Sequence, residues 1–225
     1  MRVLQGGVCS SQPRTLEGPN EITGLARDWQ AHRKASFHQS VELAQIGSQS
    51  NESGACVAFS ALWCRQIAAR PSQDAQSRMA SMKEMTTQAS QMQSEHQDRM
   101  DAADYSTGIH PFDASIRQMG LNLDWGQRMR VDVLDDEASA LGALARNLSQ
   151  EGLAHVIILG RTPDCPASGH IVAARAANNR VVLFDPNLGE FKCNPSQVPT
   201  VLRAMIANSS MRYPVPEVET IPVRS

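Results

Sequence analysis

The spacing of hydrophobic residues changes along the chain, from helical periodicity in the first half to alternation in the second. We expect residues 25–46 to form one amphipathic helix, because their apolar positions recur on one helical face. Its apolar anchors are Trp29, Phe37, Val41 and Leu43. Residues 55–69 are apolar almost throughout, which predicts a helix buried on most sides that ends before Pro71.

A polar region rich in Gln, Ser and Met follows at residues 72–104. Met79, Met82 and Met85 recur within it at helical spacing. Methionines in such a stripe pack against a core more often than they form a docking surface. We therefore expect a helical lobe whose methionine face lies on the core.

Strand-like patterns begin in the second half of the chain. The alternating segment 128–134 and the short apolar run 155–160 both predict strands. Residues 135–152, between them, predict a helix that has acidic residues in its first turn and a glycine at its end.

Residues 170–187 predict two strands joined by a turn at Asn178 and Asn179. We expect a short helix within 196–210 and then an extended edge strand or disordered tail, which contains Pro214, Pro216 and Pro222. Helices followed by antiparallel strands are the pattern of an α+β domain.

Composition bounds the class of protein. The 225 residues suffice for one compact domain, and we assign 1–24, rich in Gly, Ser, Pro and Gln, to a disordered leader and 25–225 to the folded domain. A net charge of -2, a pI near 6.3 and 4% aromatic residues argue against a nucleic-acid partner. The chain lacks an apolar run of about 18 residues and an apolar signal core, so it is cytosolic or exported by a route that reads no such signal.

Five cysteines, an odd number at irregular spacing, are a poor match to a disulfide framework. The sequence holds no CxxC pair, so we predict no zinc site, no other metal and no cofactor. Free thiols in a reducing compartment are the expectation, and one of them is a candidate nucleophile.

Three polar residues lie at the tips of apolar elements. Cys56 opens the helix at 55–69, His170 opens a predicted strand, and Asp185 closes the next strand. A helix N-terminus and a nearby imidazolium both favour a thiolate, and a carboxylate can hold the imidazole in one orientation. His170 and Asp185 are 15 residues apart with the predicted turn midway between them, so strand pairing would place them side by side.

Acyl transfer also needs donors for the developing oxyanion. The backbone N–H of Cys56 is one candidate. The side-chain amide of Asn51, five residues upstream, is the preferred second donor, and Gln49 is its rival.

The strings SGACVAFSALW, SGHIVAARA and VVLFDPNLGEF resemble the YopT/AvrPphB family of type III secreted cysteine proteases over roughly residues 40–210. The resemblance implies a papain-like fold and a triad of Cys56 as nucleophile, His170 as general base and acid, and Asp185 as the orienting carboxylate. It also places Asn51 where the family supplies an oxyanion-hole amide.

The same resemblance implies delivery by a bacterial type III system into a host cell, where the enzyme cleaves a host protein of the kinase or small GTPase class. We expect the enzyme to be a monomer. Some members cut their own leader and expose a glycine for myristoylation. Gly7, followed after three residues by Ser11, matches that acceptor pattern, and Cys9 would be the palmitoyl site of a second anchor at the host plasma membrane. Gly6 fits the pattern equally well, and an unmodified leader is the alternative.

Two other functions stay open at this point. A site of the same residue order also serves acyltransferases and transglutaminases, which would add mass to a target rather than cut it. A binding module without catalysis would use the apolar helix and the methionine-rich lobe as an interaction surface.

Overall fold

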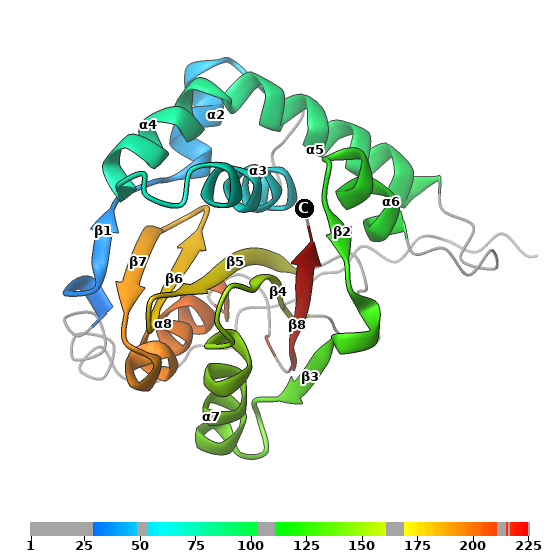
Figure 1. The fold of residues 1–225 in the computed structure, drawn as a ribbon. Helices are drawn as coiled ribbons and strands as arrows, with labels where there is room; N and C mark the ends of the chain where they lie inside the picture. The colour runs from blue at the N-terminus through cyan, green and yellow to red at the C-terminus, as the bar shows by residue number, and fades with distance from the viewer. Residues whose placement is uncertain are drawn as a thin grey trace, which may run out of the picture.

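The computed structural model describes residues 29–48, 54–102, 111–160, 169–210, 215 and 217–224, so the leader at 1–24 lies outside the described part. Within that part, one antiparallel sheet carries helices on both faces (Figure 1). No helix described here is long and apolar enough to cross a membrane.

Eight described strands form the sheet, and every pair is antiparallel. Their order across the sheet is β1 (Arg33–Ala35), β7 (Gly189–Cys193), β6 (Arg180–Asp185), β5 (His170–Ala177), β4 (Ala154–Leu159), β8 (Glu217–Arg224) and β2 (Asn122–Leu123), with β3 (Met129–Asp132) also paired to β8.

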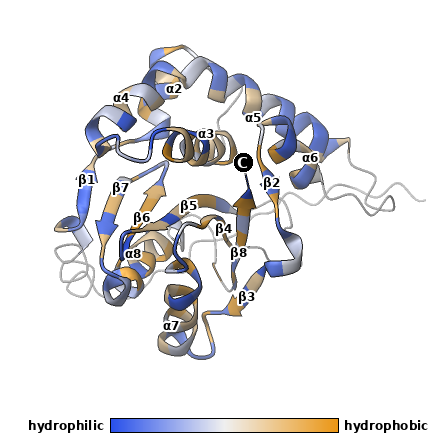
Figure 2. Cartoon of the chain, in the orientation of Figure 1, coloured by the Kyte–Doolittle hydropathy of each residue, from blue (hydrophilic) through white to orange (hydrophobic). Residues whose placement is uncertain are grey.

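Helices cover the two faces unequally. The first face carries α2 (Gln39–Gln45), α3 (Cys56–Ala69), α4 (Ala75–Glu84), α5 (Thr86–Asp101) and α6 (Pro111–Gln118). The second face carries α7 (Glu137–Leu148) and α8 (Val198–Ser210). Two short 3-10 turns lie at Trp125–Gln127 and Pro195–Gln197. Helix α3 is enclosed between the sheet and the outer helices. Figure 2 shows that it is more hydrophobic than α4 and α5, which are largely hydrophilic.

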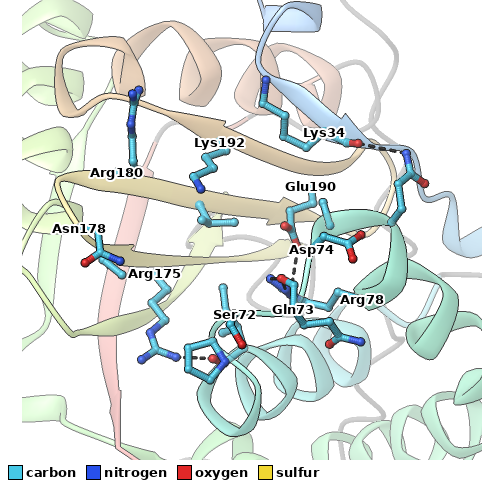
Figure 3. A pocket seen from close by; sticks show the side chains of 16 residues that line it. Lys34, Ser72, Gln73, Asp74, Arg78, Arg175, Asn178, Arg180, Glu190 and Lys192 are labelled. Atoms are coloured by element: carbon cyan, nitrogen blue, oxygen red, sulfur yellow. Dashed lines mark hydrogen bonds and ion pairs between the residues drawn. The ribbon is translucent and has the colours of Figure 1, made fainter.

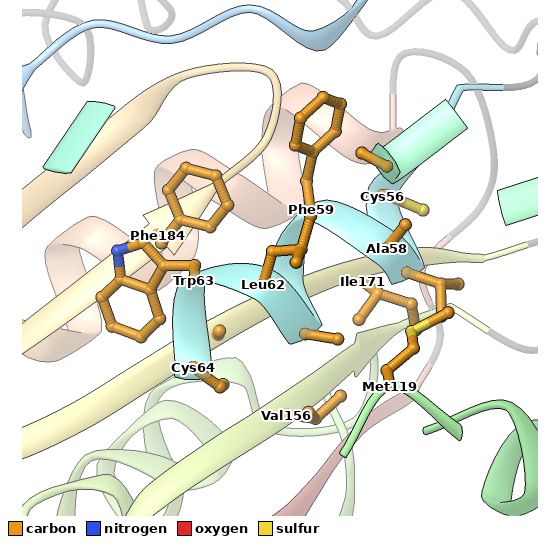
Figure 4. Packing of buried hydrophobic residues seen from close by; sticks show 14 of the residues in the cluster. Cys56, Ala58, Phe59, Leu62, Trp63, Cys64, Met119, Val156, Ile171 and Phe184 are labelled. Carbon is orange, nitrogen blue, oxygen red and sulfur yellow. The ribbon is translucent and has the colours of Figure 1, made fainter. Parts of the chain in front are cut away.

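Helix α3 is the centre of the larger core. Its apolar side chains pack on the sheet, and Trp63 stacks on Phe184 of β6 with ring centroids 5.7 Å apart. Figure 4 shows this packing along α3, with Cys56 at one end of the helix. Cys56 to Cys64 and Ile67 are all buried, so close packing fixes this part of the helix and with it the residue at its tip. The predicted helix at 55–69 is confirmed.

The hairpin of β5 and β6 follows the prediction. Asn178 and Asn179 have φ values of 54° and 55°, as a two-residue type I′ turn requires. The turn pairs Ala177 with Arg180, and this register runs along the strands to Ala173 opposite Phe184. It therefore brings the start of β5 near the end of β6.

The methionine face is also confirmed. Met79 and Met82 are 2% and 0% exposed within the core, and Met85 packs against it half-buried. The predicted lobe forms α4 and α5.

The prediction of one helix over 25–46 is wrong in its described part, since residues 33–35 form β1 and only α2 is helical beyond residue 30. The strand pairs with β7, and Lys192 N–H donates to the His32 carbonyl at 3.0 Å. Val41, expected as an anchor, is 52% exposed. Pairing with a distant strand has overridden the local helical periodicity.

The prediction of an edge strand or disordered tail is wrong in its described part as well, because β8 lies inside the sheet between β4 and β2. Pro222 pairs opposite His155, and its carbonyl accepts from Asp124 N–H at 2.9 Å. Proline normally marks edge strands, which is why the sequence pattern was misleading. The short strands β2 and β7 were not predicted.

We predict that His155 makes the fold sensitive to acid. Its side chain is fully buried, neither ring nitrogen has a hydrogen-bond partner among the described residues, and burial lowers the pKa of the imidazole from 6.5 to about 4. The unfolded chain therefore binds the proton first as pH falls from 6.5 towards 4, and stability is lost in that window. At pH 5 His155 alone contributes a loss of about 2 kcal/mol relative to pH 7.5.

Urea unfolding at the two pH values checks this prediction with His155→Leu, which cannot be protonated. The variant should lose about 2 kcal/mol less than the wild type between pH 7.5 and pH 5. His38→Leu, a change at an exposed histidine, is the matched control and should behave as the wild type. Equal losses in wild type and His155→Leu would contradict the assignment.

Candidate active site

Cys56 is the first residue of α3, and its neighbour Ala55 is the N-cap. Alanine has no side chain that could cap the helix. The backbone N–H groups of the first turn, which have no acceptor within the helix, therefore need partners from other elements. Cys56 is 8% exposed, whereas Cys64 on the same helix is 1% exposed. Both residues are buried, but Cys56 lies at the end of α3 whereas Cys64 lies within it.

His170 and Asp185 meet at the adjoining ends of β5 and β6. Nε2 of His170 lies 2.9 Å from Oδ1 of Asp185, which also accepts from Asn187 N–H at 2.7 Å. Asp185 is fully buried and His170 is 7% exposed. Since Nε2 is taken by the carboxylate, Nδ1 is the ring nitrogen left for the thiol.

The thiol of Cys56 hydrogen-bonds the His170 ring and a backbone group of Ile171. Burial opposes a charged thiolate, but the hydrogen bond and positive charge of His170 outweigh it, so the pKa of the Cys56 thiol is lowered. The pKa of His170 is raised to about 10, because the charge and hydrogen bond of Asp185 exceed the effect of burial. The two shifts have the same effect: the imidazolium of His170 is favoured up to a pH of about 10, and the thiol beside it is shifted towards the thiolate.

The other described cysteines show what burial does alone. Burial raises the pKa of Cys64 to about 12 and that of Cys193 to about 11. Both lie in the core and remain neutral thiols at neutral pH. The structure therefore distinguishes Cys56 from them, as its position at a helix start predicted.

Two glutamines from other elements cap α3. Gln39, the first residue of α2, accepts from Ala55 N–H through Oε1 at 2.7 Å, and Gln93 of α5 accepts from Ala58 N–H at 3.3 Å. Both side chains are buried. Because these caps are neutral amides, they satisfy the donors without adding a negative charge beside the thiolate. The N–H of Cys56 has no partner among the described residues.

Gln39 also ties α3 to the carboxylate. Its Nε2 donates to Asn187 Oδ1 at 2.8 Å, and its own N–H donates to the Pro186 carbonyl at 2.7 Å. Asn187 in turn donates to Asp185, which holds His170, which contacts Cys56. The contacts form a closed ring that fixes the helix tip and the strand ends relative to one another.

Close packing and a second contact support this ring. Gly54 has a φ of +90°, and a Cβ there would come within 3.0 Å of the Gln39 amide, so glycine is required before the helix. One turn into α3, the buried Ser60 hydroxyl donates to the Ile171 carbonyl at 3.0 Å. The helix is thereby bonded to β5 beside His170.

Sequence reasoning missed Gln39, Asn187 and Ser60. Each contacts a partner distant in the chain, and a glutamine at the start of a helix gives no local sign of such a contact. The absence of a capping residue before Cys56 was the available hint, because it requires caps from other elements.

The predicted oxyanion donor Asn51 and its rival Gln49 lie outside the described residues, as do Gly7 and Cys9. The structure tests none of these four. No cluster of three metal-ligating side chains occurs in the parts of the chain that are described.

Comparison with known proteins decides the family. The family model Peptidase_C58, described as Yersinia/Haemophilus virulence surface antigen, matches residues 26–220. The chain belongs to this family of cysteine proteases. The match covers most of the chain and confirms the resemblance stated from the three motifs.

Relatives agree with this assignment. The protease is 22% identical over 211 residues to a YopT-like cysteine protease of Bradyrhizobium diazoefficiens, covering 88% of this chain and 74% of the relative. Among solved structures it resembles the Pseudomonas avirulence protein AvrPphB with a TM-score of 0.63 and 26% identity, covering 78% of this chain and 94% of that one. PatoxP, a cysteine protease-like domain of the Photorhabdus asymbiotica toxin PaTox, matches with a TM-score of 0.51 and 11% identity. The match covers 91% of this chain and 58% of that one. The fold is the papain-like α+β fold that the sequence predicted.

We predict that the pKa of the Cys56 thiol stays low because the side chain at position 39 is neutral. Gln39→Glu keeps the acceptor for Ala55 N–H, loses the Nε2 donor to Asn187 Oδ1, and adds a negative charge at the helix N-terminus. Such an interaction is worth on the order of 1–2 kcal/mol, so the pKa of the Cys56 thiol should rise by roughly one pH unit. Gln39→Ala leaves the ring open and should destabilise the protease by about 1 kcal/mol without that rise.

The rate of Cys56 alkylation by iodoacetamide, followed against pH by peptide mass spectrometry, measures this pKa. Gln45→Glu, an exposed position at the other end of α2, is the control for the added charge. If the alkylation rate of Cys56 had the same pH midpoint in Gln39→Glu, Gln45→Glu and the wild type, the cap would have no influence on the pKa of the thiol.

Proposed function

We propose that Cys56, His170 and Asp185 are the catalytic triad of this protease, which cleaves a host protein after delivery by a bacterial type III secretion system. The observation that supports it is the position of the His170 ring, hydrogen-bonded to the Cys56 thiol on one side and to the Asp185 carboxylate on the other. Family membership supplies the reaction class.

Acylation begins with attack of the Cys56 thiolate on the scissile carbonyl carbon, which forms a C–S bond and a tetrahedral oxyanion. The oxyanion accepts from the Cys56 N–H and from the side-chain amide of Asn51. Collapse breaks the C–N bond, and His170 gives its Nδ1 proton to the leaving amine. An acyl-enzyme and a neutral imidazole remain.

Deacylation uses the same groups in reverse. Neutral His170 takes a proton from water through Nδ1, and the resulting hydroxide attacks the thioester carbonyl. The C–S bond breaks, the new carboxyl product leaves, and thiolate and imidazolium are restored. Asp185 holds Nε2 throughout, so the ring keeps one orientation during both proton transfers.

The chain is divided, in this proposal, into a leader at 1–24 and a monomeric protease domain at 25–225. The leader is cut by the protease itself and exposes Gly7 for myristoylation, with palmitoylation at Cys9. Two lipids provide stable attachment where one binds only marginally, which places the enzyme at the host plasma membrane. Its substrate is a host protein of the kinase or small GTPase class.

We predict that Cys56→Ala abolishes cleavage without loss of the fold, because no other described thiol is activated. Wild type and variant are incubated with eukaryotic lysate, and new N-termini are labelled and identified by mass spectrometry. Cuts made by the wild type should fall at least about a thousandfold in Cys56→Ala and in His170→Ala.

Cys64→Ala, on the same helix but in the core, should retain the cuts. The same samples report whether a new N-terminus appears at Gly7. Wild-type cleavage by purified Cys56→Ala protein, or retention of activity by His170→Ala, would exclude this triad. An acyl mass increment on targets in place of new termini would point to group transfer.

A further inference from the structure

A hollow opens at the end of α3 opposite Cys56. It has a volume of about 610 Å³ and lies between the sheet and the residues that connect α3 to α4 (Figure 3). We call it the basic groove and define it by Lys34, Arg175, Arg180 and Lys192, which come from β1, β5, β6 and β7. Its other wall is formed by residues 71–76 and Ile67.

Strand pairing orders the cations in this groove. Val182 pairs with Arg175 on one side and with Lys192 on the other, so the three side chains stand in one row across the sheet. Arg180 precedes Val182 by two residues and projects from the same face. Arg175 lies beside the last turns of α3, whereas Arg180 and Lys192 are exposed.

The carboxylates that line the groove do not neutralise its positive charge. The buried pair Arg78 and Glu190, 3.2 Å apart, neutralises itself, and Glu190 also accepts from Trp63 Nε1. Asp74 is the other lining carboxylate, and it caps α4 by accepting from Ser77 N–H at 2.9 Å. Four cations against Asp74 alone leave an excess of three positive charges, in a chain whose net charge is -2.

None of the four cations forms an ion pair with a carboxylate in the described parts of the chain. The guanidinium of Arg175 donates to the Ile67 carbonyl at the end of α3, and that of Arg180 donates to Asn194 Oδ1. These bonds use one nitrogen of each group and hold it in place. The remaining N–H donors are preorganised for a carboxylate.

We propose that the basic groove binds an acidic segment of the protein substrate, an inference that rests on the proposed protease function. Arg175 and Lys192 flank β6, so their strands are about 10 Å apart. Carboxylates three residues apart on an extended peptide span a similar distance. The volume suits several side chains of such a segment rather than a single small anion.

The groove is too far from Cys56 to hold the residues next to the scissile bond. Ile67 follows Cys56 by 11 residues of α3, which is about 16 Å along the helix. A substrate would therefore use the groove as a separate docking site. Attachment there raises the effective concentration of the cleavage segment at the catalytic site and adds specificity that the cut sequence alone lacks.

The test uses the full-length Cys56→Ala protein, so that binding is measured without turnover. A fluorescein-labelled octaglutamate is the probe, octaglutamine is the uncharged control, and anisotropy reports binding. The protein should bind octaglutamate but not octaglutamine, and added salt should weaken the binding. Arg180→Glu with Lys192→Glu should weaken it by about tenfold or more, because like charges repel.

Arg65→Glu with Arg146→Glu makes the same charge change at exposed positions outside the groove and should alter binding less than about twofold. If the doubly reversed groove variant fails to fold, Arg180→Gln with Lys192→Gln removes the same two charges. Octaglutamate binding that is absent, or unchanged in the groove variants, would overturn the proposal. Tighter binding of oligothymidylate would overturn it too, by assigning the groove to nucleic acid. Octaglutamate binding needs no catalysis. None of these results therefore bears on the test of the catalytic triad, which can fail or succeed separately.

Discussion

The pairing of a thiolate with an imidazolium at the start of α3 is the interaction on which the other features of the site depend. Burial alone would keep both groups neutral, as it does for Cys64, whose pKa is raised to about 12. His170 lowers the pKa of Cys56, and Asp185 raises that of His170 to about 10. Each charge is stable only because its neighbour is held within hydrogen-bond reach.

Much of the surrounding structure serves to hold these groups in place. The type I′ turn sets the register that brings His170 near Asp185, and the buried helix α3 brings Cys56 to them. Gln39 joins the helix tip to the turn after Asp185, so neither element can shift alone. The choice of a neutral amide at this position satisfies a backbone donor and leaves the positive end of the helix dipole available to the thiolate.

Local sequence patterns predicted the parts of this arrangement that are local. The apolar run of α3, the turn at Asn178 and the methionine face of α4 all appear as expected, and so do the places of Cys56, His170 and Asp185 at element ends. Local patterns failed where a distant partner decides the structure. Residues 33–35 became a strand by pairing with β7, and β8 lies inside the sheet despite Pro222. Gln39 and the basic groove likewise exist only through contacts that the fold creates.

The most direct test of the ion pair is a thiolate titration by ultraviolet absorbance, made on the wild type and on Cys56→Ser. Cys64 and Cys193, with pKa values of about 12 and 11, contribute no thiolate at neutral pH. The wild type should exceed Cys56→Ser by one thiolate at pH 7, and this excess should disappear in His170→Ala. Identical absorbance of the wild type and Cys56→Ser at pH 7 would contradict the ion pair.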